Sequence, residues 1–401
     1  MMLKNYNYKL KNKKMIFFLL FLIIIMLLFV SHKIVLAEGD DDSVTIQLSD
    51  AVEDLVNGID FGELEGIIDE LDSVNLFDSS IKHKLNDILN GEYFTNYSSI
   101  FTAIISLFIV DIKKFLPFLF MIISIGLLSN LIGELKSDKD STSNVIIFVC
   151  FAVSVTLILF IFKDVLQLTG LTISRISRQI QIIFPLLIAL LSSIGAFSTI
   201  SIYNPLVAVL TTIVNVVFDK LLYPIFIVVF VFLVIGNLTD AVKLNKISDF
   251  LSSLFKWIVG IVFTLFSGFL SFQGITAGKF DSVSIKATRF AVKSYIPIIG
   301  SYISEGMDFL VLGSVLVKNT IGLVGILILF VTVISPVISI LVVKLGLELC
   351  SGVLEISGCN KMSSFVSRSS KMLIYPIVII LGVSFMYVIT IALIMCTANI
   401  F

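Results

Sequence analysis

Seven stretches of at least 19 consecutive residues contain no aspartate, glutamate, lysine or arginine. A helix of that length crosses the roughly 30 Å of hydrocarbon in a bilayer. The chain of 401 residues is 57% hydrophobic and only 14% charged, whereas an average soluble chain is about 25% charged. Lipid is therefore the solvent for most of its surface. The stretches are 115–133, 141–162, 179–218, 221–239, 257–278, 319–343 and 372–401.

These stretches predict an all-α, polytopic helical membrane protein with about seven spans, give or take two. The 40-residue stretch is interrupted by Tyr203-Asn204-Pro205 and is expected to hold two passes. The amphipathic stretch 98–112 is either an interfacial helix or a short extra span.

Charge divides the chain into three blocks, although the net charge is only −1. Residues 1–37 hold six lysines and no acid, and residues 38–98 hold 16 acids against two lysines. The remainder holds 13 acids against 20 lysines and arginines. This balance argues against nucleic-acid binding through bulk charge.

The first block has the layout of an export signal. Lysines precede an uninterrupted apolar run over residues 15–30, and small or branched residues occupy the −3 and −1 positions of a cleavage after Ala37. The alternative is an uncleaved first transmembrane helix, because 16 residues is long for the core of a signal and short for a span. In both cases the next block is delivered outside the cytoplasm.

The acidic block, residues 38–98, has no apolar run long enough to span a membrane. Its apolar residues recur at helical spacing, and glycines interrupt or end the helices. We expect a small extracytoplasmic helical region. Its charge is either a docking surface for a partner or a solvated face that keeps the segment off an anionic membrane.

The third block contains a predicted internal duplication, with chance agreement among Ile/Leu/Val-rich sequence as the alternative. Two pairs of prolines, a basic pair and a polar segment recur in order at offsets of 111 to 115 residues. The expected organisation is a signal over 1–37, an acidic region over 38–98, an amphipathic helix with the first spans over 99–162, repeat 1 over 163–274 and repeat 2 over 275–401. The matches are Arg175-x-x-Arg178 with Lys286-x-x-Arg289, Pro185 with Pro297, Pro224 with Pro336, and residues 245–250 with 360–365.

The matched prolines are candidates to line a seam or conduit. Duplicated membrane proteins often place a pathway at the repeat interface beside broken helices, and a proline within a span frees a carbonyl that needs a partner. Kinks needed only for packing are the alternative for each of Pro185, Pro224, Pro297 and Pro336. Glu305 and Asp308 are either functional acids at membrane depth or part of a re-entrant or interfacial loop, and the loop is the interpretation we favour.

Basic residues suggest an orientation. The connections 163–182, with Arg175 and Arg178, and 279–293, with Lys286 and Arg289, are the most basic, so the positive-inside rule places both in the cytoplasm. This agrees with an external acidic region only if residues 98–112 also cross the membrane.

Catalytic and metal-binding patterns are missing from the sequence. Residues 38–401 contain one histidine, His83, and no HExxH, GxSxG or Walker motif. The four cysteines lack CxxC spacing and are interpreted as small hydrophobes. We therefore expect no enzyme, no cofactor and no metal.

Local sequence carries a resemblance to a known family. Together with the layout, three segments make the chain similar to the stage III sporulation protein AE family of endospore-forming bacteria, over its whole length and least over residues 1–110. No catalytic residue can be carried over from that family. The segments are Gln273-Gly274-Ile275-Thr276-Ala277-Gly278, residues 281–300 from Asp281-Ser282-Val283 to Ile296-Pro297-Ile298-Ile299-Gly300, and Val317-Lys318-Asn319-Thr320-Ile321-Gly322.

The resemblance implies a non-enzymatic subunit of the channel complex that joins the mother cell to the engulfed forespore. The implied location is the mother-cell-derived outer forespore membrane. The implied partners, besides the bilayer, are a secretion-type ATPase and ring-forming subunits, and the implied role is late forespore gene expression and forespore integrity. A stand-alone secondary transporter and a non-conducting scaffold are the alternatives.

Overall fold

The computed structural model describes residues 97–134, 141–238, 245–274, 277–295 and 300–397, together with Gly62. Within these residues the regular structure is entirely helical. The predicted signal, its cleavage after Ala37 and nearly all of the acidic region lie outside the described residues, so they stay predictions.

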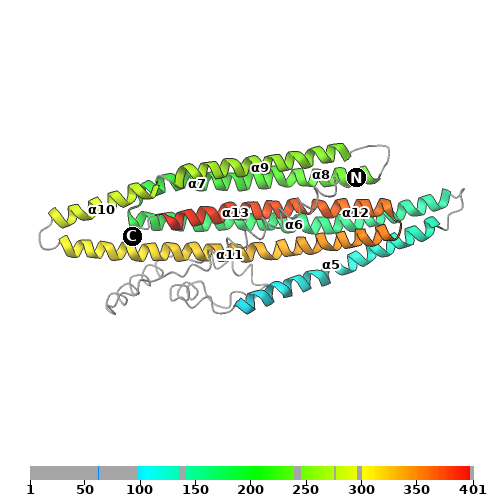
Figure 1. Ribbon diagram of the computed structural model, residues 1–401, viewed down its shortest axis with the longest axis horizontal. Helices are drawn as coiled ribbons and strands as arrows, with labels where there is room; N and C mark the ends of the chain where they lie inside the picture. Colours follow the sequence, from blue (N-terminus) through cyan, green and yellow to red (C-terminus); the bar gives the residue numbers. More distant parts are fainter. Residues whose placement is uncertain are drawn as a thin grey trace.

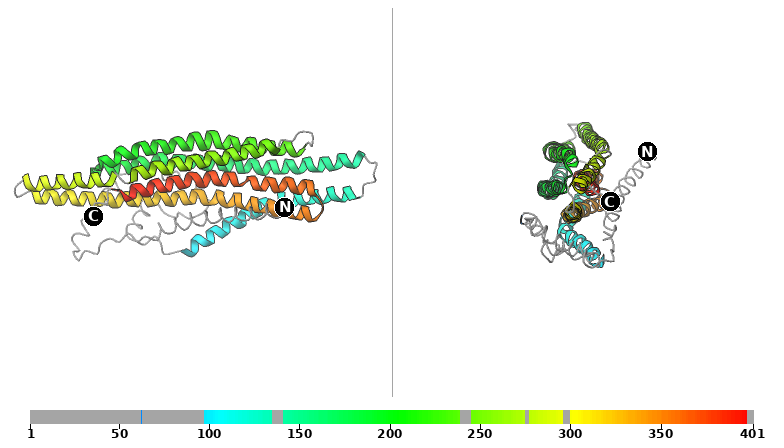
Figure 2. Two further views of the ribbon diagram at one scale, coloured as in Figure 1. Left: turned by 45° about the horizontal axis from the view of Figure 1, so that its top comes forward. Right: turned by 90° about the vertical axis from the view of Figure 1, so that its left-hand side faces the viewer.

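The helices pack side by side along one long axis (Figures 1 and 2). Helices α5, α7–η2–α8 and α11 run in one direction, and α6, α9–α10 and α12–α13 run in the other. The elements are α5 (Tyr97–Glu134), α6 (Ser141–Ile194), α7 (Phe197–Thr212), the π-helix η2 (Ile213–Leu222), α8 (Tyr223–Leu238), α9 (Asn245–Gly274), α10 (Ala277–Tyr295), α11 (Gly300–Ile356), α12 (Asn360–Met372) and α13 (Ile374–Cys396).

Six helical segments in the described residues are long and apolar enough to cross a membrane. This number lies within the predicted range, and the helical membrane class is confirmed. Six replaces the central expectation of seven mainly because α7, η2 and α8 form one continuous rod. The segments are Ile105–Ile132, Val145–Ile194, Phe197–Asn237, Lys246–Leu270, Gly306–Ile356 and Asn360–Cys396.

The reversal between α6 and α7 does not occur where the sequence predicted it. The chain turns at Gly195-Ala196, whereas Tyr203-Asn204-Pro205 lies inside α7. Gly195 has φ +81°, a left-handed conformation that glycine adopts without a Cβ penalty. The Gly195 and Ala196 N–H groups donate to carbonyls of the last turn of α6, which is the Schellman arrangement that ends helices.

Helices α6 and α11 are much longer than a bilayer is thick. They contain 54 and 57 residues, which at 1.5 Å per residue corresponds to about 81 and 86 Å against roughly 30 Å of hydrocarbon. One bilayer therefore covers only part of each helix. In α6, the polar stretch 163–181 separates two apolar parts, 145–162 and 182–194.

Helix α11 is the centre of the bundle and packs against α5, α6, α10, α12 and α13. Glycines let neighbouring helices approach it closely. A Cβ atom at Gly325 would lie 2.9 Å from Ile183 Cδ1 of α6, and one at Gly322 would lie 2.6 Å from Met395 Sδ of α13. In lipid the hydrophobic effect does not hold helices together. Small residues allow the close van der Waals packing that holds them together instead.

Substitution of two α11 glycines tests this packing. A Cβ atom at Gly346 would lie 2.5 Å from Leu119 Cδ1 of α5, whereas one at Gly352 meets no atom within 4 Å. We expect Gly346→Leu to displace α5 and to lower the free energy of unfolding by about 1–3 kcal/mol. The control Gly352→Leu should leave stability unchanged or raise it, since leucine favours a helix over glycine. Thermal unfolding in detergent measures both, and equal effects would contradict the α5–α11 contact.

Candidate functional site: a polar layer within the bundle

Polar side chains from three helices pair at two contacts of one stretch of α6, one of them buried and the other opening toward the surface. We call this group the polar layer and define it as Ser177, Gln179 and Gln181 of α6, Asn215 of η2 and Thr332 of α11. Each lies within a segment that is apolar enough to span a membrane. Polar groups at such positions are costly unless they find partners, so they are candidates for function.

Gln179 and Thr332 form the buried centre of the polar layer. They are 0% and 1% exposed, and Gln179 Nε2 donates to Thr332 Oγ1 at 2.6 Å. The Thr332 hydroxyl in turn donates to the Ile328 carbonyl of its own helix at 2.8 Å. Gln179 Oε1 has no hydrogen-bond partner among the described residues. A buried acceptor without a partner is rare, and it marks this position as a place where a polar group from elsewhere would be stabilised.

The outer part of the polar layer lies between α6 and η2. Ser177 Oγ donates to Asn215 Oδ1 at 2.9 Å, and Gln181 Nε2 lies 3.4 Å from Ser177 Oγ. A groove of about 230 Å³ opens here, which we call the α6–η2 groove. Its lining residues are Ile173, Ser174, Ser177, Arg178, Gln181, Asn215 and Asp219.

The π-helical conformation of η2 has a local cause. Pro224 follows η2 and has no N–H group, and its ring would clash with the carbonyl four residues earlier in an α-helix. A wider turn relieves this clash, and the Tyr223 N–H reaches back five residues to the Phe218 carbonyl. Most π-helical segments are single turns, and they are frequent at functional sites. The ten residues of η2, which include Asn215 of the polar layer, are longer than this.

A second polar group lies between α5, α6 and α11, beside a hollow of about 290 Å³ lined by Lys114, Asp164 and Ser339 among others. Ser339 Oγ donates to Asp111 Oδ2 at 2.5 Å. Lys114 Nζ is 3.9 Å from Asp164 Oδ2, but these side chains are 60% and 49% exposed. A pair so open to solvent stabilises little.

Lys318 of α11 is the one completely buried charged side chain among the described residues. Its Nζ donates to the carbonyls of Met395 at 3.2 Å and Thr397 at 2.5 Å, at the end of α13. The last carbonyls of a helix have no partner within it, so Lys318 supplies one. No role was predicted for this residue from the sequence. The indication in the sequence was its position, because this lysine immediately precedes the charge-free stretch 319–343.

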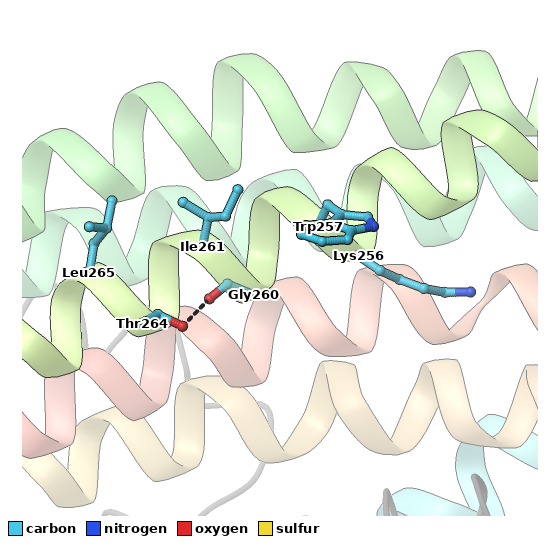
Figure 3. A pocket seen from close by; sticks show the side chains of 6 residues that line it. All are labelled: Lys256, Trp257, Gly260, Ile261, Thr264 and Leu265. Atoms are coloured by element: carbon cyan, nitrogen blue, oxygen red, sulfur yellow. Dashed lines mark hydrogen bonds between the residues drawn. The ribbon is translucent and has the colours of Figure 1, made fainter.

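A hollow of about 450 Å³ on the outside of α9 is a different kind of surface (Figure 3). Its described lining residues are Lys256, Trp257, Gly260, Ile261, Thr264 and Leu265, all on one helix. Trp257 and Leu265 are 71% and 68% exposed, and the Thr264 hydroxyl bonds the Gly260 carbonyl of its own helix. No polar groups converge there from other helices in the described chain, so we do not assign the site to it.

The three matched prolines in the described residues differ in their exposure. Pro185 and Pro224 are exposed on the outside of the bundle, whereas Pro336 is buried within α11. Pro297 lies outside the described residues. A role for these prolines in lining a seam or conduit stays a prediction.

The loop interpretation of the charged candidates is wrong. Glu305 and Asp308 lie within α11, Arg175 and Arg178 within α6, and Lys286 and Arg289 within α10. Helix α6 continues through its charges because the charged side chains lie along one exposed or half-exposed side and do not interrupt the buried face. The cytoplasmic placement of the basic residues stays a prediction.

These features define a polytopic helical membrane protein with a polar layer inside its helix bundle. Comparison with known proteins then gives the family. The chain belongs to the stage III sporulation protein AE family, whose pattern matches residues 79–398, and the resemblance seen in the sequence is confirmed.

Stage III sporulation protein AE of Bacillus subtilis (strain 168) is 22% identical to the chain over 262 residues. The match covers 65% of this chain and 66% of that relative, slightly less than two thirds of the relative's length. No solved structure matches the chain.

Two buried threonines of α11 offer a matched test of the polar layer. Thr332 accepts the bond from Gln179, whereas the Thr320 hydroxyl donates to the Leu316 carbonyl of its own helix. Both are 1% exposed. We expect Thr332→Val to lower the free energy of unfolding by about 1 kcal/mol because the Gln179 amide loses its partner. Thr320→Val should have a smaller effect. Thermal unfolding in detergent measures both, and a larger loss with Thr320→Val would contradict the assignment.

Lys318→Met tests the cap on α13. Loss of the ammonium leaves the Met395 and Thr397 carbonyls without their donor, so the last turn of α13 should open more often. We expect its amides to exchange with deuterium about tenfold faster, while the middle of α13 is unchanged. Lys344→Met is the control, because Lys344 bonds Glu348 of its own helix at 3.1 Å. Unchanged exchange at the end of α13 in Lys318→Met would refute the cap.

Proposed function

We propose that this protein is a non-enzymatic membrane subunit of the channel complex between mother cell and forespore, and that it forms or gates the conduit. Membership of the stage III sporulation protein AE family supports a role in sporulation. The observation that supports a conduit is the polar layer, because it places hydrogen-bonding side chains on helical segments that are otherwise suited to lipid. A non-conducting scaffold, in which the same bonds only hold helices together, is one alternative.

The proposed location is the mother-cell-derived outer forespore membrane. The proposed partners are a secretion-type ATPase and ring-forming subunits of the same complex. A stand-alone secondary transporter would also use polar groups within the bundle. It is the alternative that the experiment below separates from the channel subunit.

We also propose that the conduit is built from the duplicated halves. The second part of α6, α7–α8 and α9 run in alternating directions, and α10, α11 and α12–α13 repeat those directions in the same order (Figure 1). This order supports a parallel repeat. The copies have diverged at the first proline pair, since Pro185 lies within α6 whereas α10 ends at Tyr295, before Pro297.

An in-frame deletion in the native organism tests the function. Vegetative growth, spore yield and a late-forespore promoter reporter are followed together, with the wild-type chain returned in trans as the control. We expect normal growth and forespores that are engulfed but then lose late gene expression and shrink. A growth or uptake defect with normal spores would overturn the proposal in favour of a stand-alone transporter.

A further inference from the structure

The exposed stripe of α6 changes character along the helix. Over residues 145–160 the exposed side chains are mostly apolar, including Val145, Phe148 and Phe160 at 61%, 55% and 56%. Over residues 163–181 the exposed side chains are polar or charged with a single exception, Leu171. The polar set is Lys163, Asp164, Gln167, Ser174, Arg178 and Gln181. The apolar part is suited to lipid, and the polar part is not.

The η2 helix continues this polar surface across the groove. Asn215 is fixed against α6 by its hydrogen bond from Ser177, and Asp219 is exposed beside it. The surface becomes apolar at the next residue, because Val216 is 50% exposed. The polar and apolar faces of η2 therefore meet at Asn215 and Val216.

The polar surface of α6 and η2 lies between apolar segments on both helices. On α6 it is flanked by the apolar parts 145–162 and 182–194, and on the rod it is flanked by α7 and α8. A polar or charged side chain that faces hydrocarbon costs several kcal/mol. Water or a polar partner removes that cost, so this polar zone is the part of the α6 and η2 surface best suited to contact with water.

We propose that the α6–η2 groove is the water-facing wall of a solute path and that the lipid-facing side of the same helices begins at Val216. The proposal rests on the proposed conduit function and names the surface that carries it. The wall presents hydroxyl and amide groups together with one arginine and one aspartate, Arg178 and Asp219. Because these charges balance, the wall is suited to water and small hydrated solutes of either sign.

Thiol labelling of the full-length protein in membrane vesicles tests the wall. Ser174→Cys and Asn215→Cys place a thiol on its two sides, and Val216→Cys and Val209→Cys place one at exposed apolar positions of the same rod. Cys359 and Cys396 are first replaced by serine, since Cys150 and Cys350 are buried. A charged, membrane-impermeant methanethiosulfonate is applied to right-side-out and to inside-out vesicles, and a mass-tagged maleimide then counts the thiols that remain.

We expect Ser174→Cys and Asn215→Cys to react at least about tenfold faster than the valine controls from one side or both, because thiolates form in water and not in lipid. Equally slow reaction at all four positions would place the groove in lipid or against protein and overturn the proposal. Equally fast reaction would place the whole segment outside the bilayer and overturn it too. All variants must keep the thermal stability of the parent, and Ser174→Cys keeps the test valid if loss of the Ser177–Asn215 bond unfolds Asn215→Cys.

The two proposals fail separately. A sporulation defect on deletion without selective labelling would leave the function standing and place the path elsewhere. Selective labelling in a chain whose deletion leaves sporulation intact would leave a hydrated wall in a protein of another function.

Discussion

Lipid satisfies no hydrogen bond, and the architecture of this protein depends on that fact. Each backbone N–H and C=O group within the bilayer needs a partner in the protein, so the described chain is helical and its helices are long. The same demand applies to side chains. Gln179 finds Thr332 across the α6–α11 contact, and Ser177 finds Asn215 across the α6–η2 contact. At the end of α13, where the backbone has no partners left, Lys318 provides them.

Close packing and chain reversal both depend on glycine more than on proline. Gly322, Gly325 and Gly346 face side chains of neighbouring helices where an added Cβ atom would clash. Gly195 and Gly358 take left-handed conformations at the ends of α6 and α11. Prolines 117, 185, 205 and 336, by contrast, lie inside helices. A helix in lipid tolerates proline because neighbouring groups satisfy the freed carbonyl, whereas a reversal needs a residue that can adopt positive φ.

Hydropathy was sufficient to predict the helical membrane class, because long charge-free stretches have no other stable form in lipid. It misplaced the helix ends, since charge within residues 163–182 was interpreted as a loop although that stretch continues α6 with its charges on one exposed stripe. The polar layer was out of reach for a different reason. Gln179 and Thr332 are 153 residues apart, and only packing reveals that they meet. Lys318 was visible in the sequence, but its partners are backbone carbonyls that no side-chain pattern records.

The length of α6 bears on whether the protein acts alone. About 81 Å of helix leaves about 50 Å outside any one bilayer, and both of its apolar parts cannot lie in the same hydrocarbon layer. If the bilayer surrounds residues 182–194, the exposed Val145, Phe148 and Phe160 lie beyond it. A contiguous apolar surface outside the membrane needs cover from protein or lipid. A self-sufficient transporter would bury that surface within its own fold, whereas a subunit of a larger assembly leaves it for a partner. With the bilayer at residues 182–194, the exposed apolar half of α6 would therefore support the proposed assembly; with the bilayer at residues 145–162, the same surface would face lipid.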